Sequence, residues 1–219
     1  MLEELHVYDD VVPRSAALNM ALDEALLERA AAPILRFYRW RRPSISFGYF
    51  GRYADVAEQS RDREIVRRWT GGGIVPHGDD LTYSIIVPAS HSWFGQSSLE
   101  IYAEIHEAIR RALRSIGIDA LLANSASAKI SEDCFANAVR ADVMHNGQKI
   151  AGAAHRRTRA GLLHQGSIQQ RDLPDRFCND FARILCERFE PAAVSPDTLA
   201  SAATIAESKY GTPEWLTRR

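Results

Sequence analysis

The chain has 219 residues, of which 46% are hydrophobic and 25% are charged, proportions typical of an ordinary folded globular protein. Its 27 basic and 28 acidic side chains leave a formal net charge of -1, which argues against a general nucleic-acid-binding protein. Three cysteines, an odd number in a long chain, exclude a disulfide framework and indicate a reducing compartment. We therefore predict one folded domain over residues 1–219.

The N-terminal segment also bears on location. It reads MLEELHVYDDVVP and lacks the basic and apolar regions of a secretory signal peptide. No stretch approaches the ~18 consecutive apolar residues that a transmembrane helix needs. These features predict a cytoplasmic protein that has no membrane partner.

The first half of the chain predicts one long helix among several strands. Ser15 can cap a helix that continues to Ala32, since Leu18, Leu22 and Leu26 recur at helical spacing before Pro33. A short polar helix is expected at 53–62. The expected strands, bounded by proline and glycine, lie at 5–8, 34–40, 44–50, 64–69 and 81–89.

The second half predicts a hairpin between helices. Asn146-Gly147 is the strongest short hairpin signal in the chain, and Gly117 can end the helix that precedes it. The expected strands lie near 119–123 and at 141–146, 149–158 and 162–168, the last three antiparallel. The expected helices cover 98–116, Asp175–Phe189 and Asp197 to about Lys209.

Three consecutive glycines, Gly71, Gly72 and Gly73, follow Thr70 and join two of these elements. Glycine permits positive φ and lets backbone amides approach a ligand closely. Successive amides in such a turn suit a phosphate, a carboxylate or a developing oxyanion. No GK[ST] follows and no GxGxxG is present, so this is not a nucleotide-binding loop of those types. A tight connection that needs positive φ is the alternative.

A second segment runs from Gly147 to Ile168. Lys149 follows the hairpin turn, where its ammonium could neutralise charge on a carbonyl or phosphoryl oxygen. Gly152, Ala153 and Ala154 are small, as expected where a ligand lies flat across a sheet. Taken alone, a lysine at a strand start also fits a solvated edge residue.

Together the two segments resemble the biotin/lipoate protein ligase superfamily, specifically its lipoate-ligase branch. The first mark is an RRxTGGGxVxH-like loop, here Arg67, Arg68, Thr70, Gly71, Gly72, Gly73, Val75 and His77. The second is a GxK[IV]xGxA segment with an HGS-like turn, here Gly147, Lys149, Ile150, Gly152, Ala154, His164, Gln165, Gly166 and Ser167. Further matches are NMALDEALL (19–27), PSISFGYF (43–50) and KYGTPEW (209–215). The GRGRxG-type loop of biotin ligases is absent.

The resemblance implies a mixed α/β (α+β) fold, with a largely antiparallel central sheet flanked by helices. The Gly-rich loop and the Lys149 segment would line a tunnel for a medium acyl chain. Lys149 would contact the acyl carbonyl or a phosphate. The residues that would bind the substrate are Arg68, Thr70, Gly71, Gly72, Gly73, His77, Gly152, Ala154, His164 and Gly166.

Cys134, 15 residues before Lys149, resembles the cysteine of the cysteine-dependent octanoyltransferases of this superfamily. Those enzymes take octanoate from acyl carrier protein as a cysteine thioester, without a cofactor. A nearby ammonium favours the nucleophilic thiolate and stabilises the oxyanion that follows. Cys134 lies in a polar stretch, whereas Cys178 and Cys186 share a helix with core phenylalanines. An incidental loop thiol is the alternative.

Three functions follow from the resemblance. The first is transfer of an octanoyl or lipoyl group from acyl carrier protein, through Cys134, to a lysine of a lipoyl domain or glycine-cleavage H protein. The second is an ATP- and Mg-dependent lipoate-protein ligase that uses Lys149; the chain ends soon after Trp215, so this reading needs a separate accessory chain. The third is a non-catalytic paralogue that binds acyl groups or carrier proteins.

Partner and metal expectations are simpler. Two arginine clusters, at 39, 41 and 42 and at 156, 157 and 159, could meet acidic carrier proteins. Paired, solvated arginines are the alternative. No His, Cys or Asp spacing matches a zinc site, so we predict no metal.

Overall fold

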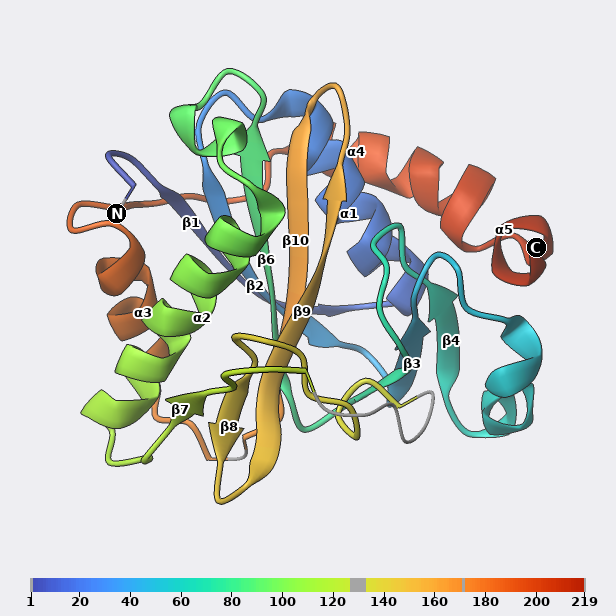
Figure 1. Cartoon of the computed structure of the whole chain (residues 1–219). Coiled ribbons are helices and arrows are strands. Elements are labelled where there is room, and N and C mark those ends of the chain that lie inside the picture. The colour runs from blue at the N-terminus through green and yellow to red at the C-terminus, as the bar shows by residue number, and fades with distance from the viewer. Residues whose placement is uncertain (1, 127–132, 171, 219) are drawn as a thin grey trace.

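The computed structural model describes residues 2–126, 133–170 and 172–218. Within these ranges an eight-stranded sheet forms the middle layer (Figure 1). In spatial order its strands are β11 (Glu190–Pro191), β1 (His6–Arg14), β2 (Ile34–Trp40), β6 (Leu81–Pro88), β10 (Gly161–Ile168), β9 (Gln148–Arg157), β8 (Val143–His145) and β7 (Leu121–Leu122). β1 runs parallel to β11 and β2, and the remaining neighbours are antiparallel. The expected mixed, largely antiparallel sheet is confirmed.

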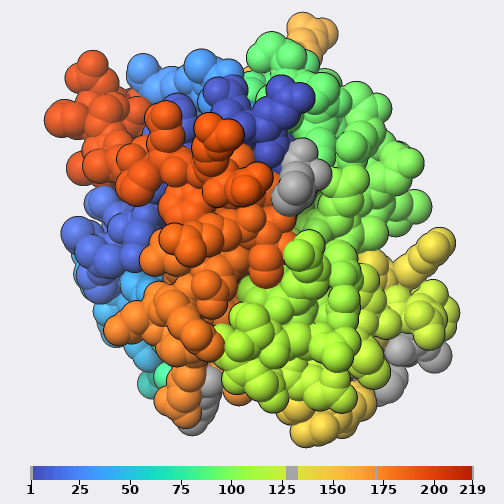
Figure 2. Space-filling view, turned by 90° about the vertical axis from the view of Figure 1, so that its left-hand side faces the viewer, coloured from blue at the N-terminus to red at the C-terminus, as the bar shows by residue number. Residues whose placement is uncertain are grey.

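Helices cover both faces of this sheet (Figure 1). One face carries α1 (Ala16–Arg29) and α4 (Pro196–Ile205), which pack with β2, β6 and β10 in one apolar cluster. The other carries α2 (Ser98–Ser115) and α3 (Phe177–Leu185), which belong to the largest cluster. Figure 2 shows α2, in green, beside the orange segment that contains α3. The flanking helices of the expected fold are therefore present.

Local sequence explains where the two longest helices begin. The Ser15 side chain accepts a hydrogen bond from Leu18 N, as expected of an N-cap. Ser97 and Glu100 form a reciprocal capping box at the start of α2. α1 is buried on almost every side, which suits a helix enclosed between the sheet and α4.

A second, three-stranded sheet was not predicted. It consists of β4 (Glu64–Arg67), β3 (Ser44–Phe47) and β5 (Val75–His77), with β3 in the middle. β3 is parallel to β4 and antiparallel to β5. The small sheet lies to one side of the central sheet, next to α5 (Pro213–Thr217) (Figure 1). It carries the Gly-rich segment between β4 and β5.

Four predicted helices differ from the structure, and the first of them, predicted to continue to Ala32, ends at Arg29. The polar segment 53–62 forms two 3₁₀ helices, Tyr53–Asp55 and Ala57–Arg61, because it has no apolar stripe to pack as an α-helix. α3 ends at Leu185 rather than Phe189, since the following chain becomes extended and pairs with β1. The last predicted helix, expected to reach about Lys209, is an α-helix only as far as Ile205, and the chain then forms a π-helix at Ala206–Tyr210.

The Asn146-Gly147 hairpin is confirmed. Both residues have positive φ, 49° and 75°, as the two-residue turn requires. The turn joins β8 to β9, and β10 follows as the third antiparallel strand. Among the described residues, the longest apolar helical stretches fall short of what a membrane-spanning helix needs.

Candidate active site

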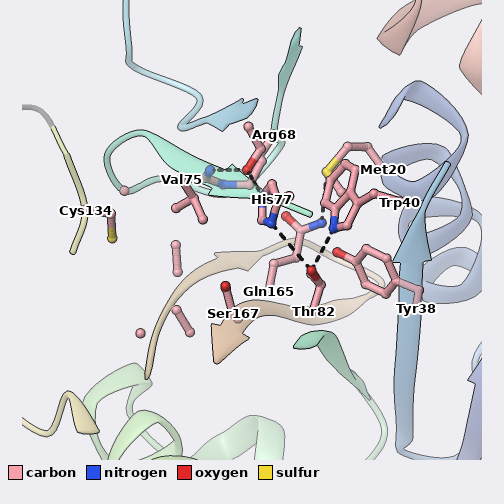
Figure 3. Close-up of a pocket in the computed structure, with 16 residues that line it drawn as sticks. Met20, Tyr38, Trp40, Arg68, Val75, His77, Thr82, Cys134, Gln165 and Ser167 are labelled. Atoms are coloured by element: carbon pink, nitrogen blue, oxygen red, sulfur yellow. Dashed lines mark hydrogen bonds between the residues drawn. The ribbon is translucent and has the colours of Figure 1, made fainter. Parts of the chain in front are cut away.

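A pocket lies between the two sheets, with the Gly-rich loop on one side and β9 and β10 on the other (Figure 3). Aromatic and aliphatic side chains gather at one end, and Cys134 lies at the other (Figure 3). The lining residues are Met20, Tyr38, Trp40, Ser46, Arg68, Gly72, Val75, His77, Thr82, Cys134, Gly152, Ala153, Ala154, Gln165, Gly166 and Ser167. A mostly apolar wall with a few converging polar groups is typical of a small-molecule site.

Cys134 is fixed beside the Gly-rich loop by its backbone. Its N–H donates to the carbonyl of Ile74 at 3.0 Å, and the preceding Asp133 forms a β-bridge with Ile74. Its side chain is partly exposed. Lys149 Nζ lies 3.5 Å from Cys134 Sγ and donates to the carbonyl oxygen of Cys134 at 3.0 Å. The fold thus brings the expected thiol and ammonium together.

Lys149 is buried, so the solvated-edge alternative is wrong. Its Nζ lies 2.8 Å from Asp142 Oδ2, a carboxylate that the sequence analysis did not single out. A Cβ on Gly152 would lie 2.3 Å from Lys149 Cε. Glycine at that position therefore leaves the space that the lysine side chain occupies.

Arg68 shapes the Gly-rich loop from inside. Its guanidinium donates to the carbonyls of Gly71 and Gly73 at 2.9 and 2.8 Å, and to Ser46 Oγ at 2.7 Å. Burial lowers the pKa of Arg68, an effect that the neighbouring Cys134 opposes. Gly72, which lines the pocket, has a φ of 85° that favours glycine. Two carbonyls of the Gly-rich loop thus face one buried cation, and anion binding by the amides of the loop stays a prediction.

Thr70 connects the loop to the central sheet and to α1. Its hydroxyl donates to Gln165 Oε1 at 2.8 Å, and Gln165 Nε2 donates to Asp23 Oδ2 at the same distance. Asp23 is paired with Arg36 at 2.8 Å, and both side chains are fully buried. Thr70 thus holds a pocket-lining glutamine in place and does not itself line the pocket.

His77 stands in a chain of hydrogen bonds along the pocket. Its Nε2 lies 2.6 Å from Ser46 Oγ, its Nδ1 lies 2.8 Å from Asp80 Oδ2, and its ring stacks on Trp40 at 4.1 Å. Burial alone would raise the pKa of Asp80, but the contact with His77 and two hydroxyl donors lower it to about 2. Asp80 is therefore ionised and fixes the ring of His77.

His164 lies outside the pocket, contrary to the expectation that it would bind the substrate. Side chains alternate along β10, so Gln165 and Ser167 face the pocket whereas His164 points to the opposite side of the sheet. There its ring nitrogens lie 3.0 Å from Tyr83 Oη and 3.0 Å from His155 Nε2. Gly166 lines the pocket, and a Cβ there would lie 2.3 Å from Tyr83.

Arg67 and the two cysteines other than Cys134 have structural roles. Arg67 donates to backbone carbonyls of Tyr49, Gly51 and the C-terminal segment, so it fastens α5 to the small sheet. Cys186 is buried in the core, and burial raises the pKa of Cys178 to about 11. Among the described residues, no group of three or more His, Cys, Asp or Glu side chains could hold a metal ion.

The basic clusters are partly engaged within the molecule. Arg156 lies over the rings of Tyr49 and Trp69, 4.8 Å from each centroid. Arg157 donates to the carbonyl of Phe94 at 2.7 Å. These contacts position the arginines on the surface and leave their expected role toward carrier proteins a prediction.

Known structures share this fold. Protein Ta0514 of T. acidophilum, solved with bound lipoic acid, has a TM-score of 0.79 at 22% identity over 99% of both chains. A lipoate-protein ligase A bound with ATP has a TM-score of 0.78 at 22% identity, again over 99% of both chains. At these identities the likeness concerns the fold, which is that of the lipoate protein ligases.

Sequence relatives are more similar. An octanoyltransferase LipM of Oceanobacillus iheyensis is 38% identical over 76% of this chain and 64% of its own length. That of Kyrpidia tusciae is 37% identical over 88% of this chain and 78% of its own length. The match thus spans less than two thirds of the O. iheyensis protein. Residues 15–190 match the model of the lipoyl protein ligase A/B catalytic domain. The chain therefore belongs to the lipoyl protein ligase A/B catalytic-domain family.

Proposed function

We propose that this protein is an acyltransferase that moves an octanoyl or lipoyl group from acyl carrier protein to a lysine of a lipoyl domain or H protein. The observation that carries the proposal is the pairing of Cys134 Sγ with Lys149 Nζ at 3.5 Å beside a mostly apolar pocket. The relatives named octanoyltransferase LipM support the same chemistry.

In the first step the thiolate of Cys134 attacks the carbonyl carbon of the carrier-bound acyl thioester. The new C–S bond forms while the carbonyl oxygen takes up negative charge, which the ammonium of Lys149 stabilises. The old C–S bond then breaks, and the carrier thiol leaves with the proton that Cys134 gave up. The acyl group remains on Cys134 as a thioester.

In the second step the uncharged amine of the acceptor lysine attacks this thioester. An amide bond forms, the bond to Cys134 breaks, and the proton lost by the amine returns to the sulfur. Because a thioester supplies the acyl group already activated, neither step calls for ATP, Mg or another cofactor. The donor and acceptor proteins are the partners of the reaction.

The pocket wall suits an aliphatic chain that ends at Cys134. Met20, Tyr38, Trp40 and Val75 supply apolar surface, which favours burial of methylene groups at about 0.8 kcal/mol each. Arg68 adds a positive charge whose hydrogen-bond acceptors, a hydroxyl and two carbonyls, are uncharged. That charge favours an oxyanion on the neighbouring acyl carbonyl.

The test is intact-mass measurement after incubation with octanoyl-acyl carrier protein. We expect one octanoyl adduct on the wild type and on Cys178→Ala, the matched thiol control from α3, and none on Cys134→Ala. A parallel incubation with lipoate, ATP and Mg measures lipoyl-AMP. If lipoyl-AMP forms and Cys134 carries no adduct, the protein is the ligase instead. If neither the adduct nor lipoyl-AMP forms, the remaining interpretation is the non-catalytic binding paralogue.

A further inference from the structure

Asp142 is paired with Lys149, the ammonium of the chemistry proposed above. It directly precedes β8, and its side chain is fully buried. Asp142 Oδ2 lies 2.8 Å from Lys149 Nζ and accepts a hydrogen bond from Val139 N at 2.6 Å. Asp142 Oδ1 accepts a hydrogen bond from the Tyr102 hydroxyl at 2.5 Å. The carboxylate therefore has a fixed position, with three partners in the part of the chain that the structure describes.

The geometry of Lys149 shows what this carboxylate does. An ammonium has three protons, and here they meet Asp142 Oδ2, the carbonyl oxygen of Cys134 and the region of Cys134 Sγ and Asn137 O. Because the first two contacts are the short ones, they fix the direction of the third proton. Asp142 thus sets the aim of Lys149 toward the thiol.

The negative charge of Asp142 also supports a role toward Lys149. A buried amine without a counter-ion favours the neutral form, which can neither attract a thiolate nor stabilise an oxyanion. The carboxylate of Asp142 offsets that cost where Lys149 is buried. The other titratable groups facing Asp142 are Tyr102 and His106 from α2 and Tyr83 from β6. Among the described residues, Arg68 is a second cation facing Cys134.

The surrounding structure holds Asp142 in place at a local cost. Ala141, the residue before it, has a φ of 68°, a left-handed conformation that residues with a Cβ rarely adopt. His106 Nδ1 lies 2.7 Å from the carbonyl oxygen of Ala141. The Tyr102 hydroxyl accepts a hydrogen bond from Ala153 N at 3.2 Å, so it cannot turn away from Asp142 without losing that bond.

We propose that Asp142 is a positioning residue that serves as the counter-ion of the buried Lys149 ammonium and directs it at Cys134. The inference rests on the proposed function, since it gives Asp142 a part in forming the reactive thiolate. It does not depend on which acyl group or acceptor the protein uses. Tyr102 acts one step further away, by fixing the carboxylate.

The experiment measures iodoacetamide alkylation of Cys134 against pH, read at the peptide that contains Cys134. We expect Asp142→Asn to raise the midpoint of the profile by about one pH unit or more, in the same direction as Lys149→Met. Asp119→Asn, which removes an exposed carboxylate near β7, is the matched control and should leave the midpoint where it is in the wild type. Circular dichroism checks that each variant is folded.

An unchanged midpoint in folded Asp142→Asn would overturn the inference, and so would a lower one, because the carboxylate would then act only by repelling the thiolate. If Asp142→Asn does not fold, Tyr102→Phe carries the test, with a smaller upward shift expected and an unchanged profile refuting it. Octanoyl loading is measured in parallel. A shifted midpoint without loading of the wild type would reject the proposed function, whereas loading with an unchanged midpoint would reject the role of Asp142.

Discussion

Three histidines on the side of the sheet away from the pocket predict how stability depends on pH. His106 lies on the buried face of α2, and its ring is near that of His164, which in turn lies 3.0 Å from His155. Burial, with a smaller effect of neighbouring positive charge, lowers the pKa of His155 to about 4 and holds the pKa of His164 well below its usual value. Burial likewise lowers the pKa of His106 to about 4, although Asp142 opposes the shift.

The direction in which stability changes with pH depends on whether the folded or the unfolded state binds more protons. Between about pH 4 and 6.5 the unfolded chain protonates these side chains and the folded protein does not. Their neutral burial therefore stabilises the fold fully above pH 6.5, and that stabilisation is lost as the pH falls toward 4. For one histidine shifted from 6.5 to about 4, the loss between pH 7.5 and 5.0 is about 2 kcal/mol.

Urea unfolding at pH 7.5 and 5.0 measures this loss. In His106→Asn, whose amide can still donate to the carbonyl of Ala141, the loss should be about 2 kcal/mol smaller than in the wild type. Ile105→Val, a core change one residue away, lowers stability at both pH values and should leave the loss unchanged. Equal losses in His106→Asn and the wild type would refute the neutral burial of His106.

Three further changes test the loop and its supports. Gly48→Ala would put a Cβ 2.0 Å from the Gly72 carbonyl oxygen and displace the loop, so the rate of Cys134 acylation should fall at least about tenfold. The control is Gly95→Ala, which has open space at its Cβ and should keep the wild-type rate. Asp80→Asn should lower the free energy of unfolding by about 2 kcal/mol at pH 7. The difference between the variant and the wild type, measured by urea unfolding, should shrink as the pH falls from about 4 toward 2. A difference that stays the same over this range would refute the prediction. Arg67→Lys loses most of the carbonyl contacts of the guanidinium, so the Tm measured by calorimetry should fall by several degrees. An unchanged Tm would show that these contacts do not contribute to stability.

Sequence reasoning succeeded where a local signal exists. Asn146-Gly147 specifies its own turn, Gly72 of the loop has the positive φ that glycine permits, and Gly152 of β9 marks a close approach of the chain to Lys149. The motif resemblance paired Cys134 with Lys149, and the fold brings their side chains to 3.5 Å. Each of these features rests on residue types whose conformational or chemical properties are unusual.

The misses come from interactions that sequence spacing does not encode. β5 has three residues, too few for a periodic pattern, so the small sheet went unpredicted. Asp142 meets Lys149 only through the pairing of β8 with β9, and Tyr102 reaches it from α2. One signal was available: alternation along residues 162–168 places Gln165 and His164 on opposite faces, which would have excluded His164 from the pocket.

The central claim is that Cys134 carries the acyl group on its way to the acceptor. The most direct measurement is a chase: wild-type protein loaded with octanoate is freed of acyl carrier protein, mixed with a lipoyl domain, and both masses are followed. The account predicts that one octanoyl group leaves the Cys134 thioester and appears on the lipoyl domain without ATP. An adduct that stays on Cys134, or a lipoyl domain acylated just as fast by Cys134→Ala, would contradict it.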